Sequence, residues 1–82
     1  MRVDRFLKVS RLIKRRAVAK EACDGGRVSI NGRIAKAGGE VKIGDIIEIR
    51  LGSSPLSVRV LLVSEAVKKD DAATMYEIIY PI

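Results

Sequence analysis

The spacing of the apolar residues changes at Gly25-Gly26, and this change restricts the possible folds more than any other feature of the sequence. Before it, apolar side chains recur at helical intervals, which predicts helices over residues 3–12 and 14–24. After it, short Val- and Ile-rich segments separated by turn residues predict strands. This order indicates an α+β fold, with two N-terminal helices packed on one side of a small, mostly antiparallel sheet.

Each predicted helix has one side suited to burial. The first helix carries Asp4 in its first turn, where a carboxylate is favourable, and its buried side is expected to consist of Val3, Phe6, Leu7 and Ser10. The second helix gathers a set of apolar, mostly small side chains on one arc: Val18, Ala19, Ala22 and Cys23. We expect Gly25 and Gly26 to end this helix with positive φ angles.

The remainder of the chain predicts strands joined by tight turns. Asn31-Gly32, between Val28–Ile30 and residues 33–36, is a strong hairpin signal because both turn residues need positive φ. Residues 41–45 indicate a turn into a strand over residues 46–51. The later segments predict a turn over 52–55, an antiparallel pair of strands over 56–63 and 75–80, and a solvated loop over 65–71.

Positive charge is concentrated at the start of the chain. The first twenty residues carry eight Lys or Arg side chains and one acid, whereas residues 21–82 carry eight basic and nine acidic side chains. The eight cations are Arg2, Arg5, Lys8, Arg11, Lys14, Arg15, Arg16 and Lys20. Such segregation favours a polyanionic partner. Phosphate and shape recognition of RNA fits best, because the second helix offers few Asn, Gln or Ser side chains to read bases.

Four other interpretations of the basic helices stay open at this point. They are a solvated helix surface, a DNA-binding surface, attachment to an acidic membrane, and a protein-interaction adaptor whose basic face meets an acidic partner. The helices use their apolar sides for the core and lack Trp, so we expect no membrane partner.

The composition gives little support for catalysis. The chain has no His, one Cys and no recognisable carboxylate pair, so we expect no enzyme, no catalytic residue, no cofactor and no metal site. A 48% apolar content predicts a folded globule, and the length predicts a single domain over residues 1–82. We further expect a cytoplasmic monomer, because the sequence shows no secretory or membrane-spanning segment.

Four segments taken together resemble the S4 RNA-binding domain family. They are Arg2-Val3-Asp4-Arg5-Phe6-Leu7, Lys14-Arg15-Arg16-Ala17-Val18-Ala19, Gly26-Arg27-Val28-Ser29-Ile30-Asn31-Gly32 and Val41-Lys42-Ile43-Gly44-Asp45. The resemblance spans roughly residues 1–51, which makes residues 52–82 a C-terminal strand extension. It implies the αL RNA-binding motif, in which the two helices and the nearby hairpin loop contact RNA.

The resemblance also implies roles for particular residues. By position, the residues expected to hold phosphates are Arg2, Lys14, Arg15, Arg16 and Lys20, and those expected near the same edge are Arg27, Asn31 and Lys36. Family members often have Ser or Thr, which can cap the second helix, at the position of Arg15. An arginine cannot cap a helix in that way, so Arg15 offers another phosphate contact instead.

The short, free-standing form of the chain is similar to S4-domain factors of bacterial ribosome-associated quality control and to related heat-shock proteins of the large subunit. That similarity implies three partners: large-subunit ribosomal RNA, peptidyl-tRNA on a split stalled ribosome, and a tailing factor that extends the nascent chain with alanine. The implied role is mechanical, namely steadying the tRNA, and the implied location is the ribosome.

Overall fold

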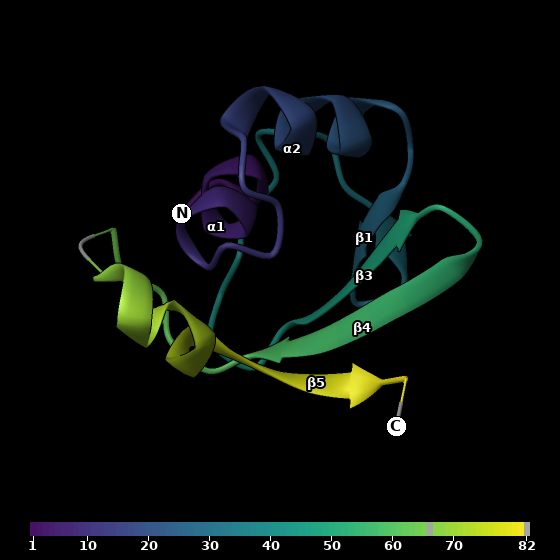
Figure 1. The fold of residues 1–82 in the computed structure, drawn as a ribbon. Coiled ribbons are helices and arrows are strands. Elements are labelled where there is room, and N and C mark those ends of the chain that lie inside the picture. Colours follow the sequence, from purple (N-terminus) through teal and green to yellow (C-terminus); the bar gives the residue numbers. More distant parts are fainter. Residues whose placement is uncertain (66, 82) are drawn as a thin grey trace.

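Two helices pack on one face of an antiparallel sheet in the computed structural model, which describes residues 1–65 and 67–81 (Figure 1). The helical elements are α1 (Val3–Val9), α2 (Arg16–Asp24) and a 3-10 helix, η1 (Lys69–Met75). The strands are β1 (Val28–Ile30), β2 (Arg33–Ile34), β3 (Ile46–Leu51), β4 (Ser54–Val60) and β5 (Tyr76–Tyr80). Within the described residues they form one sheet in the order β2-β1-β3-β4-β5, and all neighbours are antiparallel. The expected α+β arrangement is confirmed.

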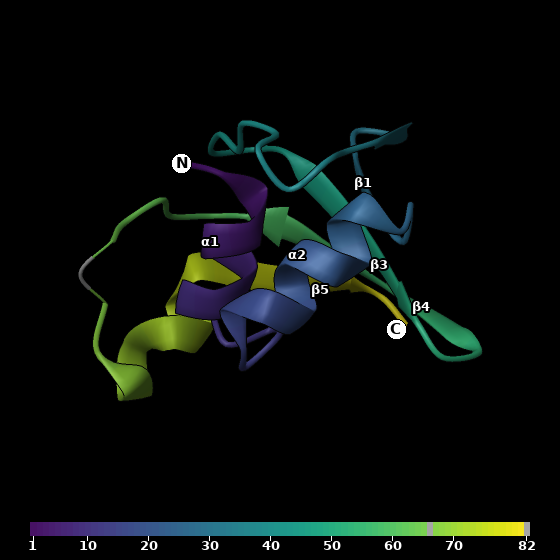
Figure 2. The ribbon, with the colours of Figure 1, turned by 90° about the horizontal axis from the view of Figure 1, so that it is seen from above.

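The two N-terminal helices lie side by side over the sheet (Figure 2). All four side chains expected on the buried side of α1 are buried, and on α2 the same holds for Ala19, Ala22 and Cys23. The prediction for Val18 is wrong, because 40% of this residue is exposed. It lies about 100° around the helix from Ala19, beyond the narrow arc of small side chains that packs on the core.

Both helices are shorter than the spacing predicted. The first ends at Val9 instead of residue 12, because Arg11 takes a left-handed conformation with φ of 63° that cannot continue a helix. The second begins at Arg16 instead of residue 14, preceded by Arg15 in an extended conformation without a side-chain capping bond. None of the helices in the described part of the chain has the length and apolarity to cross a bilayer.

One of the two glycines after α2 behaves as predicted. Gly26 has a φ of 78°, in the left-handed region that glycine tolerates, whereas Gly25 has a φ of −82°. The amide of Arg27 then donates to the carbonyl of Ala22 at 2.9 Å, which closes the end of the helix and directs the chain into β1.

The Asn31-Gly32 hairpin forms as predicted. Its φ angles are 52° and 85°, and Ser29 pairs with Ile34 across it. Residues 35 and 36, which were expected to continue the second strand, lie outside β2. The side-chain amide of Asn31 donates to Oδ1 of Asp45 at 3.0 Å, and its oxygen accepts the amide of Ile46 at 2.9 Å. The hairpin is thereby tied to the start of β3, which has the predicted bounds.

The C-terminal strands pair antiparallel as expected, with shifted ends. Strand β4 begins at Ser54, inside the predicted turn, and Pro55 pairs with Arg50. Proline is accommodated there because the pairing between β4 and β5 begins only at Ser57. The prediction of a loop over residues 65–71 is partly wrong, since η1 begins at Lys69, and residue 66 lies outside the described residues.

Candidate nucleic-acid interface

A buried carboxylate joins the starts of α1 and α2. The side chain of Asp4 is 2% exposed, yet it contacts two arginines that remain about half exposed. Arg2 places Nε 3.2 Å from Oδ1 and Nη2 3.3 Å from Oδ2. Arg16 places Nε 3.2 Å from Oδ2 and Nη2 3.5 Å from Oδ1. Both guanidinium groups therefore meet the carboxylate side-on. We call Arg2, Asp4 and Arg16 together the Asp4 clamp.

Local backbone contacts explain why the clamp forms here. The amide of Arg5, in the first turn of α1 where helix amides lack internal partners, donates to Oδ1 of Asp4 at 2.8 Å. The backbone of Arg2 is held by an isolated bridge to Glu40, and the amide of Val3 donates to the carbonyl of Gly39 at 2.7 Å. The start of α1 is therefore fixed to the loop before β3.

The clamp keeps its carboxylate ionised. Burial opposes the negative charge of Asp4, but hydrogen bonds from Arg16 and Arg2 outweigh it and hold the pKa of this carboxyl below its usual value. A buried acid that stays charged between two cations fixes their side chains, at the cost of one unit of positive charge on the surface.

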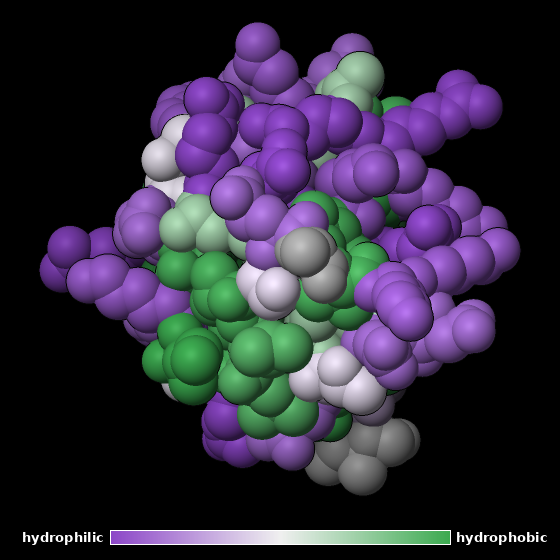
Figure 3. Space-filling view, turned by 90° about the vertical axis from the view of Figure 1, so that its left-hand side faces the viewer, coloured by the Kyte–Doolittle hydropathy of each residue, from purple (hydrophilic) through white to green (hydrophobic). Residues whose placement is uncertain are grey.

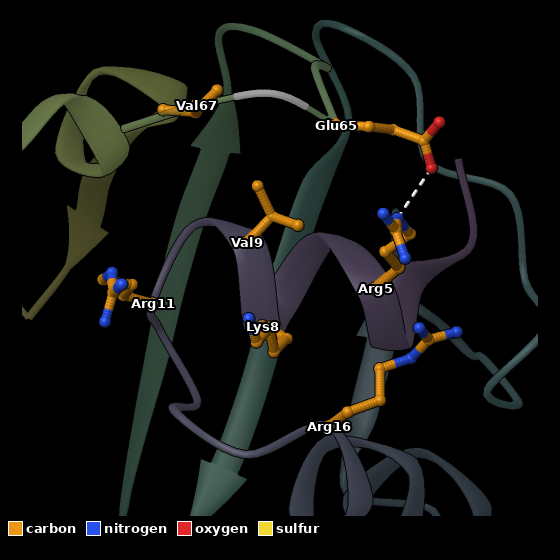
Figure 4. A pocket seen from close by; sticks show the side chains of 7 residues that line it. All are labelled: Arg5, Lys8, Val9, Arg11, Arg16, Glu65 and Val67. Carbon is orange, nitrogen blue, oxygen red and sulfur yellow. Dashed lines mark ion pairs between the residues drawn. The ribbon is translucent and has the colours of Figure 1, made fainter. Parts of the chain in front are cut away.

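A basic groove of about 350 Å³ lies beside α1 (Figure 4). Its cationic lining combines side chains from α1, from the turn that follows and from the start of α2: Arg5, Lys8, Arg11 and Arg16. The apolar side chains Val9 and Val67 form part of its wall. Glu65 also lines the groove, with Oε1 2.6 Å from Nε of Arg5. The groove is thus cationic, with one exposed carboxylate at its rim.

The other cations predicted from the N-terminal segment do not line this groove. Lys14 and Arg15 are exposed in the turn between α1 and α2, and Lys20 is exposed one turn after Arg16 on α2. Four of the eight predicted cations therefore line the groove, and Arg2 joins Arg16 in the Asp4 clamp. Their phosphate contacts stay predictions.

The structure does not bring Arg27, Asn31 and Lys36 into the groove. Lys36 donates to the carbonyl of Asp24 at 3.3 Å, at the far end of α2. The side chain of Asn31 is occupied by its bonds to the start of β3. Arg27 lines a separate hollow with Glu48 and Arg50, which form an ion pair at 2.9 Å.

Sequence reasoning missed the role of Asp4. It placed this acid correctly in the first helical turn but assigned it only an interaction with the helix dipole. A signal was present, because Asp4 lies about 60° from Leu7 around α1, at the edge of the buried arc. Glu65 was also missed, since nothing in the local sequence relates it to Arg5, sixty positions earlier.

One face of the molecule carries an apolar patch next to hydrophilic surface (Figure 3). Among the exposed large apolar side chains are Ile43, Leu61 and Leu62. The first two lie close together, because the amide of Gly44 donates to the carbonyl of Val60 at 2.8 Å. The surface of the protein is therefore not uniformly polar.

The fold and the basic helices define an S4-type protein. The chain belongs to the S4 domain family, whose model matches residues 1–47. It is 54% identical over 78 residues to a Halalkalibacterium halodurans protein named RQC P-site tRNA stabilizing factor, covering 95% of this chain and 89% of that protein. A Bacillus subtilis protein of the same name is 53% identical over 79 residues, covering 96% and 92% of the two chains. The resemblance seen in the sequence is confirmed.

A solved structure shares the whole architecture. The trimeric structure of heat shock protein 15 from Vibrio cholerae superimposes with a TM-score of 0.88 at 28% identity, covering 98% of this chain and 82% of that chain. Because the superposition covers 98% of this chain, the similarity extends beyond the S4 segment to η1 and the C-terminal strands.

Proposed function

We propose that this chain is a non-catalytic RNA-binding factor of ribosome-associated quality control. It binds the large ribosomal subunit of a split stalled ribosome through ribosomal RNA, and it binds the peptidyl-tRNA that remains there. The observation that carries the proposal is a groove lined by four of the N-terminal cations, one of which, Arg16, also joins Arg2 in the Asp4 clamp. Arginine forks in such an arrangement match the oxygens of backbone phosphates.

The comparisons support the ribosomal part of the proposal. Relatives that cover nearly all of this chain carry the name RQC P-site tRNA stabilizing factor. A related role here is to hold the tRNA in the P site while a partner factor supplies alanyl-tRNA, so that the nascent chain receives a C-terminal alanine tail. The protein acts in the cytoplasm on the ribosome and works as a monomer.

The mechanism is mechanical. Two RNA segments repel each other through their phosphates, and cations placed between them lower that repulsion. The helices that carry those cations rest on a sheet through fully buried side chains, among them Phe6, Leu7 and Ile47. A rigid support limits the conformational entropy lost on binding, which favours a long-lived complex.

Sedimentation with purified particles tests the binding step. We expect the protein to sediment with large subunits that carry peptidyl-tRNA, and less with large subunits stripped of tRNA or with intact ribosomes. Equal sedimentation with all three particles would exclude a tRNA-dependent role. In cells without the protein, stalled nascent chains on large subunits should lose their alanine tails, and unchanged tails would remove the tailing step from the proposal.

The alternative is a protein-interaction adaptor that presents its basic face to an acidic partner. The neighbouring exposed apolar residues Ile43 and Leu61 favour a protein contact of some kind, so this alternative needs a direct test. Capture from lysate with and without ribonuclease separates the two functions. Partners lost on digestion support the RNA-binding factor, whereas partners retained unchanged support the adaptor.

A further inference from the structure

Asp4 is out of place on a surface proposed to bind phosphate. It is the only acid in the first twenty residues, and it lies between two of the cations assigned to RNA. A carboxylate at that position repels phosphate and lowers the local positive potential. If Asp4 belongs to an RNA-binding surface, it must favour binding in some other way that offsets this repulsion.

We propose that Asp4 is a positioning residue that fixes Arg2 and Arg16 as one preformed receptor for RNA phosphates. The proposal rests on the proposed function and adds a residue to its site. Asp4 itself does not touch RNA, because its side chain is 2% exposed and lies beneath the two guanidinium groups.

The geometry leaves both arginine forks partly free. Each guanidinium faces Asp4 with Nε and Nη2, at distances between 3.2 and 3.5 Å. A guanidinium has five N–H donors, so about three remain on each side chain for other acceptors. Side-chain exposures of 53% for Arg2 and 43% for Arg16 show that the remaining edges reach solvent. Two guanidinium groups oriented by one carboxylate can donate to a single phosphate between them or to two consecutive phosphates.

The residues that orient the two guanidinium groups are themselves held by the backbone and by the helices. Asp4 is held by the amide of Arg5 at 2.8 Å, and Arg16 is the first residue of α2. The clamp therefore also sets the start of α2 against the start of α1. An unrestrained arginine loses conformational entropy when it binds phosphate, because rotation about several of its side-chain bonds stops. Restraint before binding lowers that entropy loss.

The charge of Asp4 and its positioning of the two arginines predict opposite effects of Asp4→Asn on RNA binding. The substitution keeps the shape of the side chain and raises the net charge of +6 by one unit. If long-range charge dominates, RNA binding becomes tighter. If Asp4 acts by position, binding becomes weaker despite the added positive charge, because two side chains lose their orientation.

The matched control is Glu21→Gln, which makes the same change of charge at an exposed position on α2. We expect Asp4→Asn to bind large subunits carrying peptidyl-tRNA about tenfold more weakly, and Glu21→Gln to bind as tightly as the wild type or tighter. In an Arg2→Lys/Arg16→Lys background, which keeps the charge but lacks the forks, Asp4→Asn should cause no further loss. Binding by Asp4→Asn as tight as by Glu21→Gln would overturn the proposal.

A second measurement uses the free protein. Nuclear magnetic resonance of the arginine Nε–H groups should show Arg2 and Arg16 ordered in the wild type and averaged in Asp4→Asn. Arg15, which has no ion pair among residues 1–65 and 67–81, serves as the mobile reference, and the backbone amides of Phe6 and Leu7 report that the variant is folded. Unchanged order of Arg2 and Arg16 would refute the positioning role. If the wild type fails to bind the particles, the proposed function falls, and this second measurement still decides the role of Asp4.

Discussion

Arg16, the first residue of α2, lies 3.2 Å from the carboxylate of Asp4 in the first turn of α1. The contact joins two residues that are twelve positions apart, each in the first turn of its helix, and Arg2 completes it from the other side. One buried charge thus links the packing of the helices to the cations on their surface. Both the stability of the fold and the proposed RNA binding depend on it.

The clamp predicts a loss of stability in acid. Since the pKa of Asp4 is lower in the folded protein, the unfolded chain binds the proton more readily, and stability from this group is complete above about pH 5. It is lost as the pH falls below about 4 and passes through the lowered pKa. Denaturant titrations should therefore show Asp4→Asn less stable by about 1–3 kcal/mol at pH 7. A difference from the wild type that stays constant down to pH 2 would contradict the ionised clamp.

Salt dependence measures how many phosphates are bound. If about five phosphates are engaged, the logarithm of affinity for large subunits carrying peptidyl-tRNA should fall against the logarithm of salt concentration with a slope of roughly −3.5 to −4.5. The measurement is equilibrium binding between low and physiological salt. A flat response would show that phosphate contacts do not lead the binding.

The Asn31 side chain should contribute to stability through its two bonds, to Asp45 at 3.0 Å and to Ile46 at 2.9 Å. Asn31→Gly keeps the left-handed backbone conformation but removes both bonds, so we expect a loss of about 1–2 kcal/mol in the free energy of unfolding. Asn31→Ala should cost more, because alanine resists a φ of 52°. Equal stability of Asn31→Gly and the wild type would show that the two bonds contribute nothing.

The Cys23 thiol should be unreactive in the folded protein. Burial, with smaller contributions from the charges of Asp4 and Asp24, raises its pKa to about 11. At pH 8 we expect iodoacetamide to modify the native protein at least about a hundredfold more slowly than the protein in denaturant. Comparable rates in the two states would show that the core around Cys23 opens readily.

Local features of the sequence predicted the structure correctly where the backbone preferences of the residues determine it. Asn31-Gly32 formed its hairpin because few other residue pairs accept two positive φ angles, and the predicted strand over residues 46–51 was correct to the residue. The period of the apolar residues likewise identified the buried side of α1.

The missed features depend on contacts between distant parts of the chain. Arg11 ends α1 with a φ of 63°, which an arginine adopts only where the surrounding structure requires it. The burial of Asp4 depends on Arg16, and the position of Glu65 in the groove depends on the path of the chain after β4. The spacing of residues within α1 places Asp4 at the edge of the buried arc, but it cannot predict which distant residues Asp4 or Glu65 contacts.

The most direct test of the central claim compares two double variants with the same loss of charge. Arg2→Ala/Arg16→Ala removes the cations of the clamp, whereas Arg50→Ala/Arg59→Ala removes two exposed arginines of β3 and β4 that pair with Glu48 and Glu77. In sedimentation with large subunits carrying peptidyl-tRNA, the first variant should lose most of its binding and the second should retain it. Equal binding of both variants and the wild type would contradict the assignment of the RNA-binding surface to the two helix starts.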